Sequence, residues 1–337
     1  PLAGTAVYMT PYPRLNKCHY EKKVPTRNWL YQKPVDILIR ASNGASDFGN
    51  KFGQPLICGS ILTFEHFENE EILSYDKVIM LAGGVGFGKK SESIKEKPNK
   101  GELVVLLGGD NYRIGMGGAA VSSTDTGSNI NSLELNAVQR SNPEMQKRVS
   151  NVIRALVEKN KNPIISIHDH GAGGHLNCFT ELMEETGGDI NIDNFPIGDP
   201  TLSLKEILGN ESQERMGLIV NKKNINLVKK IADRERSPIY VVGKITNNNK
   251  FKFYSKKNNE TAIDLSNKDL FGSSPKKILI DNSVKKSFTK ISYNDKKVKK
   301  YLKKIFELES VACKDWLTNK VDRCVTGKVA LQQCTGE

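Results

Sequence analysis

The sequence lacks several features that would restrict the protein to a particular class. Its six cysteines include no C-x-x-C pair, so the sequence indicates neither a zinc site nor a disulfide framework, and we expect reduced thiols. No apolar run approaches the ~20 residues of a membrane-spanning helix. The first residues do not form a signal peptide, and no internal repeat is visible. These absences favour a globular, cytoplasmic protein with no membrane partner.

Charge is abundant and mostly basic. The 337 residues carry a formal net charge of +12, which suits either a nucleic-acid partner or a surface on which lysine has accumulated. Lysine and asparagine are enriched together at 247–250 and 256–259, and the lysine-dense stretch 296–304 has Tyr301 as its only aromatic residue. We therefore favour accumulation of lysine on the surface and predict no nucleic-acid partner. A positive electrostatic field would still attract phosphorylated substrates.

Apolar periodicity predicts a mixture of strands and helices. Pro143 at the first helical position and Asn142 as the N-cap support the clearest helix, 143–159. The elements do not follow a strict βαβ rhythm, so we expect an α+β or mixed α/β fold. The other expected helices are 176–186, 225–236 and 296–308. The expected strands are 35–39, 56–58, 77–81, 103–107, 164–167, 216–220, 241–245 and 325–329, with a Gly/Asn-rich loop at 41–55 and a charged linker or surface turn at 89–101.

Two polar segments adjoin apolar strands and indicate chemistry. Asp169 follows the strand at 164–167 and precedes the flexible turn 171–174, and the polar string 210–215 precedes the strand at 216–220. Carboxylates are ligands that suit Mg²⁺, and the backbone N–H groups of a glycine-rich turn can bind phosphate. The three histidines at 168, 170 and 175 match no standard zinc spacing. The run 115–120 fits G-x-G-x-x-A, but a poor helix start follows, so we favour phosphate binding or main-chain packing over a dinucleotide.

Three motifs, in this order and spacing, carry a family resemblance: HDxGAGG at 168–174, GDPTLSxxEI at 198–207 and GNESQERM at 209–216. The chain resembles the phosphoribosylformylglycinamidine synthases. The resemblance implies an ATP-dependent ligase of purine biosynthesis that converts formylglycinamide ribonucleotide, with ammonia from glutamine, to formylglycinamidine ribonucleotide. It also implies an aminoimidazole ribonucleotide synthetase-like two-domain unit, in which a β-rich N-terminal domain precedes an α/β C-terminal domain.

The resemblance implies roles for individual residues. Asp169 corresponds to a metal ligand, and Glu211, Ser212, Gln213 and Gln139 correspond to contacts with the ribonucleotide substrate. Cys58, Gly59 and Ser60 correspond to a segment near bound nucleotide, so Mg²⁺ and ATP are the expected cofactors. Simpler interpretations stay open: Asp169 as a cap of the following turn, 211–213 as a polar strand entry, and Gln139 as an exposed residue before a helix. No catalytic residue is assigned.

The resemblance divides the chain into three parts: residues 1–100 end a first N-terminal-type domain, 101–282 form a C-terminal-type α/β domain, and 283–337 begin a second N-terminal-type domain. The unit is thus expected to be incomplete at both ends and inactive alone. Its expected partners are the phosphorylated ribonucleotide, the rest of the synthetase chain and a glutaminase domain that is missing here. The alternative function is a non-catalytic Mg-nucleotide-binding module of the same superfamily.

Overall fold

The structure, a computed structural model, describes residues 2–9, 33–54, 56–75, 78–125, 129–138, 142–281, 287, 289–308, 310–312 and 317. The chain forms two compact units, one from residues 1–88 and 279–337 and the other from residues 89–278. The break after Gly88 falls at the start of the charged stretch that we expected as a linker or surface turn. The division into three parts at 100 and 282 stays a prediction. No helix among the described residues is long and apolar enough to cross a bilayer.

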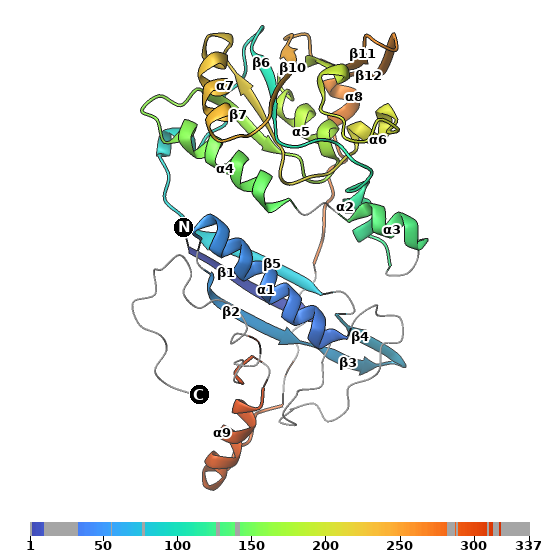
Figure 1. The fold of residues 1–337 in the computed structure, drawn as a ribbon. Coiled ribbons are helices and arrows are strands. Elements are labelled where there is room, and N and C mark those ends of the chain that lie inside the picture. The colour runs from blue at the N-terminus through green and yellow to red at the C-terminus, as the bar shows by residue number, and fades with distance from the viewer. Residues whose placement is uncertain are drawn as a thin grey trace. The chain divides into compact units, whose positions relative to one another are not determined.

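The first unit is built on a three-stranded sheet in the order β2-β1-β5 (Figure 1). Strand β1 pairs in parallel with β2 and antiparallel with β5. Its buried core contains Val7, Met9, Leu38, Ile61 and Leu317. The strands are β1 Leu2–Met9, β2 Leu56–Thr63, β3 Glu65–Glu68, β4 Glu71–Ser74 and β5 Ile79–Val85, and the helices are α1 Pro34–Phe52 and α9 Val298–Phe306.

Helix α1 overturns two sequence predictions. The expected strand at 35–39 and most of the expected loop at 41–55 form this one helix, which Pro34 begins and Gly53 ends in the left-handed conformation. Val35, Leu38 and Ile39 lie at helical spacing and pack in the core of this unit. A short apolar run cannot be assigned to strand or helix by periodicity alone, and here contact with the sheet decides it.

The second unit contains a seven-stranded mixed sheet in the order β12-β11-β8-β10-β6-β9-β7. All neighbours are antiparallel except β8 and β11. The order of strands and helices along the chain confirms the expected mixture without a strict βαβ rhythm. The strands are β6 Leu103–Leu107, β7 Ile164–Asp169, β8 Gly188–Asn191, β9 Met216–Val220, β10 Ile239–Ile245, β11 Lys250–Ser255 and β12 Glu260–Ser266.

Helices cover both faces of this sheet. In β6, Val104 and Leu106 belong to the core shared with α5 and α6, and Val105 and Leu107 belong to the core shared with α4 and α7. This alternation follows from the two-residue period of a strand whose two faces are both buried. The helices are α2 Gly118–Ser122, α3 Asn131–Ala137, α4 Pro143–Val157, α5 Gly174–Leu182, α6 Leu204–Leu208, α7 Ile225–Arg234 and α8 Asn267–Phe271.

Helix α4 confirms the clearest helix prediction. Its N-cap is Asn142, whose side-chain oxygen accepts a hydrogen bond from Met145 N at 3.1 Å. Helices α5, α7 and α9 also occur within or close to their expected ranges, as do all the strands expected between residues 103 and 245. The strand expected at 325–329 lies outside the described residues.

Candidate functional site

The site lies where β7 ends and β9 begins. These strands pair antiparallel, with Asp169 opposite Met216 in the register. The end of one strand and the start of the other therefore lie at the same edge of the sheet. Asp169 and the segment 210–215, called the corner below, are brought close together by this pairing, although they are about forty residues apart in sequence.

Backbone hydrogen bonds fasten the corner to two neighbouring loops. Ser212 N donates to His170 O at 2.8 Å, and His170 N donates in return to Arg215 O at 3.3 Å. On the other side, Glu211 N donates to Gly115 O at 2.7 Å. The loop that follows β6 and the glycine turn that follows β7 thus both attach to the corner.

Two glycines permit this close approach. Gly115 and Gly174 have φ values of 75° and 58°, a left-handed conformation that other residues adopt only with strain. A Cβ at Gly174 would lie 2.5 Å from Asn210 O, and one at Gly115 would collide with Glu211 O. Glycine is therefore needed at both positions to bring the loops against the corner.

The Glu211 carboxylate joins the same loops through its side chain. It is 4% exposed, and its Oε1 accepts from Gly173 N at 3.1 Å. Its Oε2 accepts from Ala119 N at 3.2 Å. Backbone N–H groups thus compensate a buried carboxylate, so Glu211 has a structural task whether or not it contacts a ligand.

Ser212 and Gln213 lie in different environments. Ser212 is 6% exposed, and its Oγ has no hydrogen-bond partner among the residues that the structure describes. A buried hydroxyl without a partner is uncommon in folded proteins, and here the oxygen is enclosed by the surrounding residues. Gln213 is exposed, whereas Gln139 lies outside the described residues.

A hollow of about 570 Å³ adjoins the Glu211 carboxylate. Small residues form much of its wall, which leaves backbone close to any occupant. Lys205 and Glu206 are the other charged residues of the lining, and the Glu206 carboxylate accepts hydrogen bonds from Ser203 and Arg113. The lining residues are Met116, Gly117, Ala119, Ala120, Gly173, Lys205, Glu206, Gly209 and Glu211.

Asp169 is exposed at the end of β7, and its Oδ1 accepts a hydrogen bond from Gly171 N at 2.7 Å. The carboxylate therefore caps the glycine turn, as the simpler interpretation expected. Its neighbour His168 places Nε2 2.6 Å from Glu181 Oε2. Within the part of the chain that the structure describes, no three His, Cys, Asp or Glu side chains gather to hold a metal ion.

His170 and His175 pack on aromatic rings beneath the corner. Both are fully buried, and their ring centroids are 4.7 Å apart. Burial, reinforced by the nearby Arg215 guanidinium, holds the pKa of each well below its ordinary value. They are therefore neutral at physiological pH.

Sequence reasoning did not single out Arg215. This side chain is fully buried, and it reaches Asn111, His175 and Asn210. Its position inside the GNESQERM motif was the available signal. An arginine just before an apolar strand is ordinarily read as an exposed residue, because arginine is rarely fully buried.

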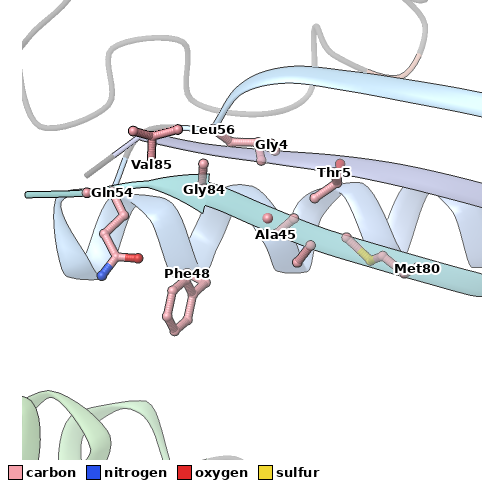
Figure 2. A pocket seen from close by; sticks show the side chains of 13 residues that line it. Gly4, Thr5, Ala45, Phe48, Gln54, Leu56, Met80, Gly84 and Val85 are labelled. Carbon is pink, nitrogen blue, oxygen red and sulfur yellow. The ribbon is translucent and has the colours of Figure 1, made fainter. Parts of the chain in front are cut away.

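Cys58, Gly59 and Ser60 lie in the other unit, on the exposed part of β2. In the register they stand opposite Gly4, Thr5 and Ala6 of β1. A hollow of about 410 Å³ in this unit is lined by residues of α1, β1 and β5, together with Gln54, Leu56 of β2 and Gly86 (Figure 2). None of its lining residues is charged, and none of the three predicted residues is among them. Their nucleotide-binding role stays a prediction.

Comparisons with known proteins show which proteins this chain is similar to. The family model of the AIR synthase related protein, C-terminal domain, matches residues 99–256. The phosphoribosylformylglycinamidine synthase of Dictyostelium discoideum is 39% identical over 99% of this chain, which covers 26% of that protein. The chain thus spans about a quarter of the length of this curated relative.

Solved structures show the same fold. The structure titled "T. maritima PurL complexed with FGAR" aligns with a TM-score of 0.63 and 21% identity, covering 86% of this chain and 43% of that one. "T. maritima PurL complexed with ATP" aligns with a TM-score of 0.59 and 18% identity, covering 87% and 41%. These matches confirm the AIR synthase-like fold. By its sequence, this chain belongs to the family of the phosphoribosylformylglycinamidine synthases.

Proposed function

We propose that this chain provides the ribonucleotide-binding part of an ATP-dependent ligase that makes formylglycinamidine ribonucleotide from formylglycinamide ribonucleotide, ammonia and ATP. The observation that supports it best is the corner that carries Glu211 and Ser212, which backbone hydrogen bonds fasten to two glycine loops beside a hollow. The titles of the similar structures name FGAR and ATP as bound molecules.

In this reaction the substrate amide oxygen attacks the terminal phosphorus of ATP, and ADP leaves. Ammonia then adds to the amide carbon, and the phosphate leaves to give the amidine. The protein must neutralise phosphate charge, align the reacting groups and exclude water. Ammonia would come from a glutaminase domain, which is the proposed partner of the synthetase.

The residues near the corner suit these tasks. Ser212 Oγ can donate to a phosphate or ribose oxygen and accept from a ribose hydroxyl. Lys205 is among the residues that line the hollow, and its ammonium can neutralise phosphate charge. Glu211 can accept from a ribose hydroxyl through a lone pair that its two backbone donors leave unused, and Gln213 and Gln139 remain proposed contacts.

Asp169 is the proposed Mg²⁺ ligand. Mg²⁺ commonly takes one or two protein carboxylates and completes its shell with phosphate oxygens and water, so a single exposed aspartate fits without a cluster of protein ligands. When bound, Mg²⁺ would neutralise the phosphates of ATP. The capping bond from Gly171 N orients the carboxylate for this role.

The test is equilibrium binding of formylglycinamide ribonucleotide to the chain. Ser212→Ala should weaken binding roughly tenfold, the effect of losing about 1.4 kcal/mol of hydrogen bonding. Ser237→Ala is the matched control, because Ser237 is 3% exposed and its Oγ also lacks a partner within the described part of the chain. It should leave affinity unchanged.

Equal affinity of the Ser212→Ala variant and the unmodified chain would refute the assignment of Ser212. Binding of ATP alone, with no affinity for the ribonucleotide at any Mg²⁺ concentration, would instead favour the non-catalytic nucleotide-binding module. Asp169→Asn should remove the Mg²⁺ dependence of nucleotide binding.

A further inference from the structure

Arg215 is the last residue of the corner, and its side chain is enclosed by the protein. The residue is fully buried, and a Cβ at Gly108 would meet its Cγ at 2.7 Å. It directly precedes β9, and its side chain reaches back to Asn210 at the start of the corner. None of its atoms lines the hollow beside Glu211.

The guanidinium joins three segments that are distant in sequence. Nη1 donates to Asn111 Oδ1 and lies 2.9 Å from His175 Nε2. Nη2 donates to the side-chain oxygen of Asn210 and, at 3.0 Å, to its carbonyl oxygen. The loop after β6, helix α5 and the start of the corner therefore converge on one planar group with a fixed donor geometry.

The partners of Arg215 are themselves anchored. Asn210 Nδ2 donates to Tyr112 O at 2.8 Å and Ile114 O at 2.9 Å. Asn111 Nδ2 donates to Pro196 O at 2.8 Å, which directs its oxygen toward Arg215. His175 Nε2 also lies 2.9 Å from Asn111 Oδ1, which only accepts, so this ring nitrogen donates to Asn111 in one tautomer and accepts from Arg215 in the other.

The backbone of Arg215 extends this arrangement to Ser212. Arg215 N donates to Ser212 O at 3.1 Å, and Arg215 O accepts from His170 N. Since Ser212 N also bonds to His170 O, fixing Arg215 fixes Ser212 against the loop that carries Asp169.

We infer that Arg215 is a positioning residue: its guanidinium holds Glu211 and Ser212 in the geometry that receives the ligand, without touching the ligand. The ligand part of this inference rests on the proposed function, whereas the effect on the corner does not.

The test compares Arg215→Lys with Arg154→Lys, an exposed arginine of α4 that pairs with Glu158. Lysine keeps the charge but cannot bridge the Asn111 and Asn210 groups together. Amide hydrogen exchange in 210–216 and 170–175 should quicken at least tenfold in Arg215→Lys, with exchange in β6 and α4 unchanged. Ribonucleotide affinity should fall at least tenfold. Arg154→Lys should alter neither.

A second pair of variants serves if Arg215→Lys does not fold. His175→Gln keeps a hydrogen-bonding group beside Asn111 and Arg215 and should retain local protection, whereas His175→Leu should lose it. Unchanged exchange at the corner in Arg215→Lys, or equal protection in the two His175 variants, would overturn the inference. If the unmodified chain does not bind the ribonucleotide, the proposed function fails, and the exchange measurements still decide the role of Arg215.

Discussion

At the residue scale, Gly174 and Gly117 share a left-handed backbone but differ in the space around them. Their φ values are 58° and 63°. A Cβ at Gly174 would press on the backbone of Asn210, whereas a Cβ at Gly117 would meet nothing within 4 Å. Substitution of Gly117 therefore tests the strain of the left-handed conformation alone. Substitution of Gly174 tests that strain together with the collision against Asn210.

We predict that Gly117→Ala lowers the free energy of unfolding by about 1–2 kcal/mol, the cost of a left-handed non-glycine residue. Gly174→Ala should cost at least twice as much, because the corner must also move. Equilibrium denaturation measures both values, with the slope checked for a change in cooperativity. Equal losses in the two variants would mean that the corner is not held tightly against the glycine turn.

At the element scale, Asp193 secures the turn between β11 and β12. Its carboxylate accepts from Ser255 Oγ at 2.6 Å, Lys256 N at 2.7 Å and Lys257 N at 3.1 Å. Burial alone would raise the pKa of Asp193, but these hydrogen bonds outweigh it and hold the pKa below its ordinary value. The native state therefore favours the ionised carboxylate.

Because its pKa is lowered on folding, Asp193 stabilises the protein above its unfolded pKa of about 3.9. That stabilisation disappears as the pH falls through the lower folded pKa. Asp193→Asn should cost roughly 1 kcal/mol at pH 7, and less as the pH falls below about 4. Thermal unfolding from pH 7 to pH 3 measures this, with the exposed Asp233→Asn as control. A pH-independent difference would contradict the assignment.

At the scale of the whole molecule, the chain covers only part of the length of its relatives, and this bears on whether it can catalyse the reaction alone. The chain matches 26% of the Dictyostelium discoideum synthase, so most of that protein's residues have no counterpart in it. We predict that the chain forms no formylglycinamidine ribonucleotide in a single-turnover assay with formylglycinamide ribonucleotide, ammonia, ATP and Mg²⁺. Product formed faster than in the absence of protein would contradict the prediction, and binding of the substrate without turnover would agree with it.

The sequence by itself determined the elements that can be recognised from their own local residue pattern. Helix α4 has helical apolar spacing, an N-cap and an N-terminal proline, and β6 is a short apolar run followed by glycines. The motifs located Asp169 and the corner, because glycine turns and polar strand ends are local features. Cys58–Ser60 and Gln139 stay predictions that rest on the resemblance.

Only the tertiary structure decided features that depend on distant partners. The run 35–39 became part of α1 because a sheet covers its apolar face, and Arg215 became buried because Asn111, His175 and Asn210 surround its guanidinium. The local sequence gives the chemical groups of each side chain. Whether a charged side chain is solvated or enclosed depends on the free energy of contacts between segments that the chain brings together only when it folds.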